Sequence, residues 1–208
     1  MRPLGVILAG GLATRMGGGD KALLRLNGRP LLSHVTERLA PQVGAMALNA
    51  NGDPARFATF GLPVIPDSIG GFPGPLAGVL AGLDWAAGQG AEAIVTVAGD
   101  TPFFPADLVA RLVEASHGQT HPLVLAATKG EAETRSKSRS GLIRHPTFGL
   151  WPVALRDDLR AALEGGLRKV VLWTEPHGGR ECVFPTDACD PFFNVNTPED
   201  LARAEGMT

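Results

Sequence analysis

Cysteine is scarce in this sequence, and its scarcity excludes two classes of small protein. The 208 residues contain only Cys182 and Cys189, which are too few for the disulfide framework of a secreted domain. No histidine accompanies them at the spacing of a zinc site. We therefore expect two free thiols in a protein of a reducing compartment.

An excess of one charge and long apolar runs are lacking as well. The formal net charge of −2 and the pI of about 6.2 argue against a protein that binds nucleic acid or a membrane surface. No stretch of about 18 apolar residues predicts a membrane span, and the first residues do not form a signal peptide. The expected location is cytoplasmic, with neither nucleic acid nor membrane as a partner.

Glycine (27 residues) and proline (17) are abundant, and they gather in short loops after strand-like segments. Hydrophobic patterning predicts strands at residues 4–9, 45–49, 62–65, 93–98, 123–128 and 146–151. It predicts helices at residues 31–39, 75–87, 105–116 and 155–163, a short helix after residues 165–166, and a last helix from Pro198, with Thr197 as N-cap. This alternation indicates a single α/β domain over residues 1–208, Rossmann-like and three-layered, with a mainly parallel central sheet.

Ligands bind such sheets at the carboxyl ends of the strands, and the first such end carries a glycine-rich loop at residues 10–20. Its backbone N–H groups could cradle phosphate oxygens, while Arg15 and Lys21 supply cations for a triphosphate. No Ser or Thr follows Lys21, so this is not a Walker A loop. The alternative is that the glycines serve turns only.

Asp100 directly follows the clearest strand and is the best candidate for a metal ligand. Magnesium binds one or two carboxylates and completes its shell with phosphates and water. The alternative, an N-cap, requires a helix to start at the next residue, whereas the pattern starts one at Pro105. The sequence therefore favours Asp100 as a magnesium ligand.

Asn49 and Asp67 also end predicted strands, although each has a plain structural reading in a capped or Asx turn. Residues 129–140 are polar and carry a net positive charge. That segment is either a surface loop or a lid that contacts an anionic substrate.

The motif LAGG-x3-RMGG-x-DK at residues 8–21 resembles the nucleotidyltransferase loop of the molybdenum cofactor guanylyltransferases. The segments NAN (49–51), PGPLAGV (73–79), GDTP (99–102), HPT (145–147) and FNVNTPEDL (193–201) resemble the same family, in the expected order over nearly the whole chain. The loop alone is shared with sugar-phosphate and cytidylyl enzymes, and the last segment with PGPLAG is more specific. The resemblance implies a nucleotidyltransferase fold with the nucleotide held by residues up to about 120.

The resemblance implies transfer of GMP from GTP to molybdenum-molybdopterin, with magnesium as cofactor and pyrophosphate as leaving product. Position by position, it implies nucleotide contacts from Leu8, Ala9, Gly10, Lys21, Asn49, Asp67 and Asp100, metal binding at Asp100, and pterin-side contacts from Asn194 and Asn196. Arg15, Lys21 and Asp100 would be the catalytic residues. We expect a monomer that transiently contacts other proteins of molybdenum cofactor biosynthesis.

The segment 129–144 is longer than in that family, which puts pterin contacts there in doubt. Two other functions remain open from the sequence. One is a CTP-dependent transferase acting on molybdopterin or a sugar phosphate, because base choice depends on few hydrogen bonds. The other is a nucleotide-binding module without catalysis, against which the presence of Arg15, Lys21 and Asp100 argues.

Overall fold

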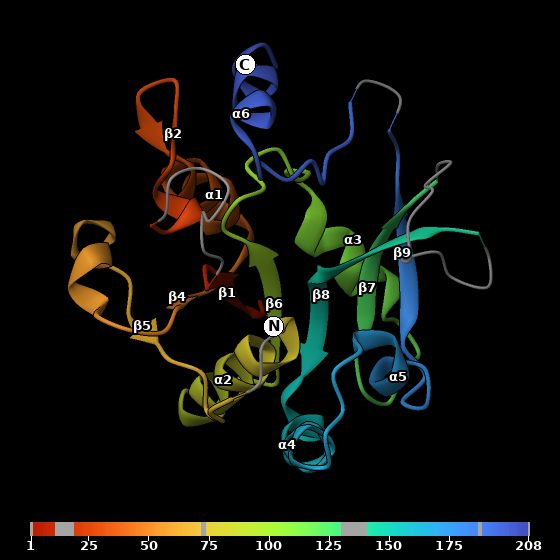
Figure 1. Cartoon of the computed structure of the whole chain (residues 1–208). Helices are drawn as coiled ribbons and strands as arrows, with labels where there is room; N and C mark the ends of the chain where they lie inside the picture. Colours follow the sequence, from red (N-terminus) through yellow and green to blue (C-terminus); the bar gives the residue numbers. More distant parts are fainter. Residues whose placement is uncertain (1, 11–18, 72–73, 130–140, 187–188, 208) are drawn as a thin grey trace.

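The computed structural model describes residues 2–10, 19–71, 74–129, 141–186 and 189–207, and a seven-stranded sheet forms its centre (Figure 1). The strand order is β5-β4-β1-β6-β8-β7-β9. The strands are β1 (Leu4–Leu8), β4 (Met46–Asn49), β5 (Val64–Ile65), β6 (Ala93–Ala98), β7 (Val124–Thr128), β8 (Ile143–Pro152) and β9 (Arg180–Phe184). Among the described strands of this sheet, only β8 pairs antiparallel with its neighbours, so the mainly parallel sheet expected from the sequence is confirmed.

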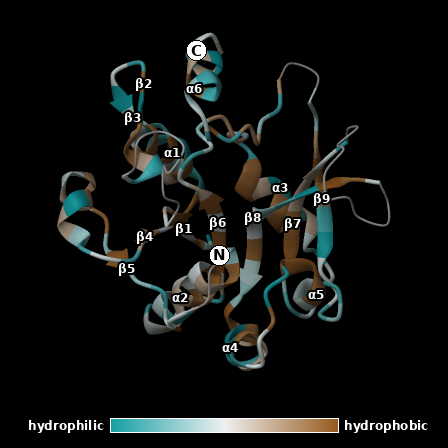
Figure 2. Cartoon of the chain, in the orientation of Figure 1, coloured by the Kyte–Doolittle hydropathy of each residue, from teal (hydrophilic) through white to brown (hydrophobic). Residues whose placement is uncertain are grey.

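Helices cover both faces of this sheet and make three layers. The helices are α1 (Leu31–Leu39), α2 (Pro75–Gly88), α3 (Leu108–Ala115), α4 (Arg156–Glu164) and α5 (Val170–Thr174). In β1, Val6 packs with α2, α4 and α5, whereas the next residue, Ile7, packs with α1 and α3. Successive side chains of a strand point to opposite faces, so a continuously apolar strand must be covered on both. Figure 2 shows this apolar centre between more polar outer surfaces.

The last helix, α6 (Pro198–Glu205), begins where the sequence predicts. The Thr197 side chain accepts a hydrogen bond from the Asp200 backbone N–H, and the Asp200 carboxylate accepts one from the Thr197 backbone, which makes a capping box. A small apolar cluster that includes Leu26, Val195 and Ala204 holds this end of the chain against the hairpin of β2 (Arg25–Leu26) and β3 (Arg29–Pro30).

Two details differ from the sequence expectations. The predicted helix at 105–116 begins only at Leu108, with Asp107 as its N-cap, because Pro105 lies in the preceding turn. Strand β9 and the β2–β3 hairpin are not among the predicted strands. Asp100 precedes every residue of α3, in agreement with its exclusion as a cap.

Strand β8 has an irregularity that bears on the site. Leu125 of β7 pairs with Gly149, but the next residue, Ala126, pairs with His145. Residues 146–148 therefore bulge from the β7 ladder at the end of the sheet where β6 terminates. Bulges of this kind redirect side chains near ligand sites, and here Thr147 reaches a cavity.

None of the described helices combines the length and the apolar character needed to cross a membrane. Cys182 is buried, Cys189 is exposed, and both are free thiols, as expected.

Candidate active site

The carboxyl ends of four parallel strands meet in one row and form the floor of a cavity of about 610 Å³. Leu8 is in register with Asn49 on one side and with Ala98 on the other, and Asn49 is in register with Ile65. The cavity is lined by Leu8, Ala9, Gly10, Lys21, Ala22, Asn49, Asn51, Asp67, Gly71, Gly74, Pro75, Ala98, Gly99, Asp100 and Thr147. All seven positions expected to contact a nucleotide thus lie in one cavity.

Leu8, Ala9 and Gly10 line the cavity floor at the end of β1. The carbonyl of Leu8 accepts a hydrogen bond from the Gly99 backbone N–H (3.0 Å), and the Ala9 N–H donates to the Asn49 carbonyl (2.9 Å). These bonds extend the sheet by one residue and fix the backbone at the start of the loop. Arg15, the other expected cation of this loop, lies outside the described residues.

Lys21 connects the beginning of the chain with its end. Its Nζ donates to Asn196 Oδ1 at 2.6 Å and lies 3.9 Å from Asp100 Oδ2. The lysine and aspartate side chains are only 23% and 20% exposed, so their attraction is less screened than on an open surface. The two predicted catalytic residues of the described chain are therefore neighbours.

Asp100 lies in an environment that disfavours an isolated charge. Burial raises the pKa of its carboxyl, while the Lys21 ammonium and the Thr101 hydroxyl act in the opposite direction. The Thr101 hydroxyl is 3.2 Å from Asp100 Oδ1 and donates to Asn194 Oδ1. A carboxylate that is largely desolvated gains most from a cation bound against it.

The donor set fits magnesium better than a metal with an all-protein shell. Among the residues that the structure describes, no three His, Cys, Asp or Glu side chains gather as a metal site. Magnesium binds through one or two carboxylates and takes its other ligands from phosphates and water. One partly buried carboxylate, that of Asp100, beside an open cavity matches that requirement.

The opposite wall is built by two asparagines around Asp67. Asn49 Nδ2 donates to Asp67 Oδ1 (3.0 Å), and Asn51 Nδ2 donates to Asp67 Oδ2 (2.8 Å). Asn51 Oδ1 in turn accepts from the Asp67 backbone N–H (2.9 Å). Asn49 and Asp67 therefore contact each other across neighbouring strand ends instead of each capping its own turn.

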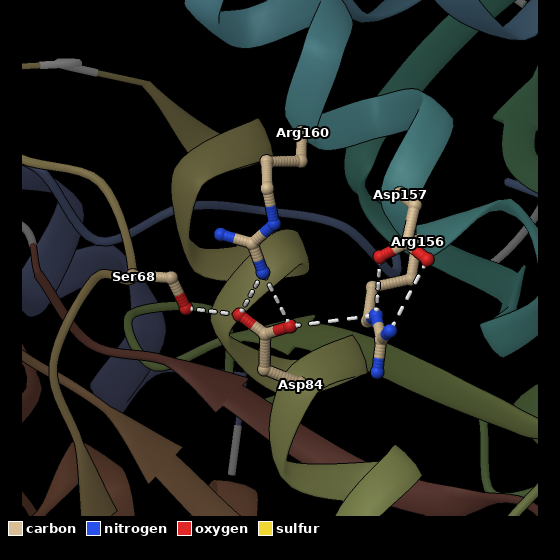
Figure 3. A network of polar contacts seen from close by, with 5 residues as sticks. All are labelled: Ser68, Asp84, Arg156, Asp157 and Arg160. Atoms are coloured by element: carbon tan, nitrogen blue, oxygen red, sulfur yellow. Dashed lines mark hydrogen bonds and ion pairs between the residues drawn. The ribbon is translucent and has the colours of Figure 1, made fainter.

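The loop that carries Asp67 is also held from behind by a charged network (Figure 3). Ser68 Oγ donates to Asp84 Oδ2 at 2.5 Å, and Arg160 Nη2 contacts both oxygens of Asp84 at 2.6 and 2.8 Å. Arg156 lies 3.6 Å from Asp84 and pairs more closely with Asp157. The network joins α2 and α4 to the residue next to Asp67, so the cavity wall is supported by both helices.

Asn194 and Asn196 do not line the cavity, but both contact residues at or next to its lining. Their side chains contact Thr101 and Lys21, respectively, while Val195 between them is buried. This agrees with the expectation that two asparagines two positions apart on an extended segment face the same side. Contacts with a pterin remain a prediction.

His145 supports the segment before these asparagines. Its ring stacks on Phe192 with a centroid distance of 4.3 Å, and its Nε2 lies 2.9 Å from Thr128 Oγ1. Burial lowers the pKa of His145 to about 4, with Asp190 acting in the opposite direction. The imidazole is therefore neutral near pH 7 and has a packing role.

Sequence reasoning missed three residues that build the site. Asn51 and Thr147 line the cavity, and the buried Thr101 connects Asp100 with Asn194. The spacing of Asn49 and Asn51 was a usable signal, since alternate residues of an extended chain share a side. Thr147 reaches the cavity through the bulge of β8, which leaves no pattern in the sequence.

Solved structures share the fold of this chain over nearly its whole length. The solved structure of 4-diphosphocytidyl-2C-methyl-D-erythritol synthase from Anaerococcus prevotii is similar, with a TM-score of 0.74, 13% identity and coverage of 99% of this chain and 95% of that one. Molybdopterin-guanine dinucleotide biosynthesis protein A from Archaeoglobus fulgidus has a TM-score of 0.72 at 21% identity, with 98% and 97% coverage. At these identities the likeness establishes the fold alone.

Sequence similarity gives the family. The model of the MobA-like NTP transferase domain matches residues 5–177, and the chain belongs to this family. It is 52% identical to a molybdenum cofactor guanylyltransferase of Bradyrhizobium sp. (strain ORS 278), covering 98% of this chain and 92% of the relative. It is 50% identical to one of Cereibacter sphaeroides, with 100% and 97% coverage. The resemblance found in the sequence motifs is therefore confirmed.

Proposed function

We propose that this protein transfers GMP from GTP to molybdenum-molybdopterin, giving the guanine dinucleotide form of the cofactor and pyrophosphate. The structural observation that carries the proposal is the placement of Lys21 and Asp100 on one wall of the cavity and the Asn49–Asp67 pair on the other. Relatives about half identical over nearly the whole chain carry the name of this activity.

The reaction forms one bond and breaks one. A phosphate oxygen of molybdopterin attacks the α-phosphorus of GTP, and the bond from that phosphorus to the bridging oxygen of the β-phosphate breaks. The attacking group is already an anion, so the protein needs no strong general base. Positioning and charge neutralisation supply most of the catalysis in such transfers.

Each described residue takes a role suited to its place. Lys21 contacts the phosphates, and its bond to Asn196 holds the ammonium at the edge where the second substrate enters. The backbone of Leu8–Gly10 and the side-chain amide of Asn49 orient the nucleotide. Asp100 holds a magnesium ion, which neutralises phosphate charge when bound.

Asn194 and Asn196 face the pterin substrate in this proposal. Asn196 contacts Lys21, and Asn194 contacts Thr101, the residue after Asp100, so the pterin phosphate would meet the α-phosphate of GTP beside the Lys21–Asp100 pair. The remainder of the chain after about residue 120 completes the sheet and this second side. The protein acts as a monomer that hands its product to other proteins of the pathway.

Pyrophosphate release tests the proposal directly. The purified protein, molybdenum-molybdopterin and magnesium are incubated with GTP, CTP, ATP or UTP, and the pterin product is identified by mass spectrometry. We expect pyrophosphate and the guanine dinucleotide to form with GTP and with none of the other three nucleotides. Formation of product with CTP would mean that CTP is the nucleotide substrate. Absence of pyrophosphate with all four nucleotides would refute catalysis. Replacing magnesium by manganese or calcium in the same assay tests the metal.

A further inference from the structure

Arg56 lies outside the cavity, yet it connects the two segments that form the cavity's opposite walls. It belongs to the 3-10 segment Pro54–Phe60 between β4 and β5, and its side chain is 28% exposed. Nε donates to Asp20 Oδ2 at 2.6 Å. On the other side, Nη1 donates to the carbonyl of Asp53 (2.6 Å) and Nη2 to the carbonyl of Asn51 (2.5 Å).

The first contact leads to the cavity wall that carries Lys21 and Asp100, which we call the phosphate wall. Asp20 directly precedes Lys21, and its carboxylate is only 12% exposed. A largely buried carboxylate needs a charged partner, and Arg56 provides it. The backbone position from which the Lys21 side chain reaches Asp100 and Asn196 is therefore fixed by Arg56.

The other contacts lead to the opposite wall. The Asn51 side chain makes two hydrogen bonds to Asp67: its amide nitrogen donates to the carboxylate, and its amide oxygen accepts from the backbone N–H. A guanidinium bonded to the Asn51 carbonyl orients the peptide from which that side chain projects. A shift of this peptide would change both bonds to Asp67 together.

The turn between these carbonyls is shaped around the guanidinium. Gly52 has φ +85°, and a Cβ at this position would lie 3.1 Å from Arg56 Nη1. The left-handed conformation and the close approach both favour glycine. The ring of the buried Phe57 lies under the guanidinium, 4.7 Å from its carbon to the ring centroid. The arginine is thus held by a charge, two carbonyls and an aromatic face.

We propose that Arg56 is a positioning residue that fixes the phosphate wall, through Asp20, relative to the Asn51–Asp67 wall, so that one nucleotide can contact both at once. The inference rests on the proposed function, because it requires a nucleotide in this cavity. It assigns no contact between Arg56 and substrate. The benefit is preorganisation: walls held in place before binding lose less entropy when the ligand binds.

Substitution of Arg56 by lysine or by methionine distinguishes its contact with Asp20 from its contacts with the two backbone carbonyls. Arg56→Lys keeps a charge for Asp20 but cannot reproduce the planar, several-donor geometry that serves two carbonyls as well. Arg56→Met removes all of these bonds and keeps a side chain of similar length. Arg180→Met is the matched control, because Arg180 also donates to two carbonyls, of Ala115 and His117, at the opposite end of the sheet.

The experiment is calorimetric titration of each purified protein with GTP and with inorganic tripolyphosphate, both in magnesium. We expect Arg56→Met to bind both ligands about tenfold more weakly, the change that a lost charge-assisted hydrogen bond gives. Arg56→Lys should recover tripolyphosphate binding but not GTP binding. Arg180→Met should bind both as the unchanged protein does. In kinetics, the KM for GTP rises in Arg56→Met, while kcat and the KM for molybdenum-molybdopterin stay within about twofold.

Thermal unfolding of each variant without ligand shows whether it is folded. If Arg56→Met and Arg180→Met bind GTP equally well, the inference is wrong even though the proposed function stands. Equal recovery of GTP and tripolyphosphate binding in Arg56→Lys would also overturn it, because the carbonyl bonds would then be dispensable. If the unchanged protein binds no GTP, the proposed function fails, and the role of Arg56 fails with it.

Discussion

Gly78 of α2 packs directly against the Asn49 side chain at the end of β4. A Cβ at Gly78 would overlap the Asn49 amide oxygen and lie 2.8 Å from the Leu8 side chain. The absence of a side chain therefore allows the helix to approach the two strand ends that form the cavity floor. It also leaves room for the Asn49 amide to reach Asp67.

The first prediction follows from this contact. Gly78→Ala should lower the free energy of unfolding by about 1–3 kcal/mol through overpacking and should weaken GTP binding, because Asn49 must move. Gly88→Ala in the same helix is the control, since a Cβ there meets no atom within 4 Å. The control should be as stable as the unchanged protein or slightly more so. Urea unfolding and GTP titration measure both effects, and equal behaviour of the two variants would contradict the prediction.

The second prediction concerns Asp100→Asn. It should lower turnover by about 100-fold or more, as expected for loss of a principal charge-stabilising group. The folded protein should keep its stability near pH 7, because burial already raises the pKa of this carboxyl. A raised folded-state pKa makes the ionised form a stability cost that sets in as pH rises above the unfolded value, and asparagine removes that cost. A variant that retains normal turnover at saturating magnesium would refute the metal assignment.

Lys21→Met should weaken GTP binding by tenfold or more, since a charge-assisted contact to phosphate is lost. Asn196→Ala removes the hydrogen-bond partner but keeps the ammonium, so its effect on GTP binding should be smaller. Titration with GTP in magnesium compares the two. A larger loss in Asn196→Ala than in Lys21→Met would mean that the lysine does not contact the nucleotide.

Arg160→Met tests the support behind Asp67. Arg160 contacts both oxygens of the partly buried Asp84, so its loss should lower the free energy of unfolding by about 1 kcal/mol. Arg156→Met should cost less, because the closest partner of Arg156 is the exposed Asp157. Chemical denaturation of both variants gives the order, and the reverse order would show that Arg156 is the main partner of Asp84.

The pH dependence of stability should report His145. The pKa of this residue falls to about 4 in the folded protein, from 6.5 in an unfolded chain. The unfolded state therefore binds the proton first as pH falls. Stability from this group is complete above about pH 6.5 and declines down to about pH 4. His145→Gln should flatten the unfolding free energy in that window, and an unchanged slope would contradict the prediction.

Sequence patterns predict the parallel core well because its strands are buried on both faces. Segments such as residues 93–98 are apolar apart from the buried Thr96 and are followed by glycine or a polar residue, which indicates both the strand and its end. The edge strand β9 is only five residues long, with buried positions at every second residue, and it begins with Arg180 and Glu181, so it has no such signal. The β2–β3 hairpin does have a sequence signal, the pair Asn27-Gly28, whose positive φ angles suit a tight turn.

The candidate site could be located from strand ends and motifs, but its internal bonds could not. The pairing of Asn49 with Asp67 and of Lys21 with Asn196 depends on which strands are neighbours and on where the chain's last segment docks. Neither is encoded within a few residues of the positions concerned. The bulge that brings Thr147 to the cavity depends on the register between β7 and β8, which is likewise a property of the assembled sheet.

The bond between Lys21 and Asn196 joins residues 175 positions apart. During synthesis the lysine leaves the ribosome early, whereas its partner follows only after the whole sheet has emerged. A nascent chain can thus complete its parallel strands while the reaction centre is still open on one side. Contacts of such long separation slow folding, so this edge of the cavity is completed only when nearly the whole chain is present.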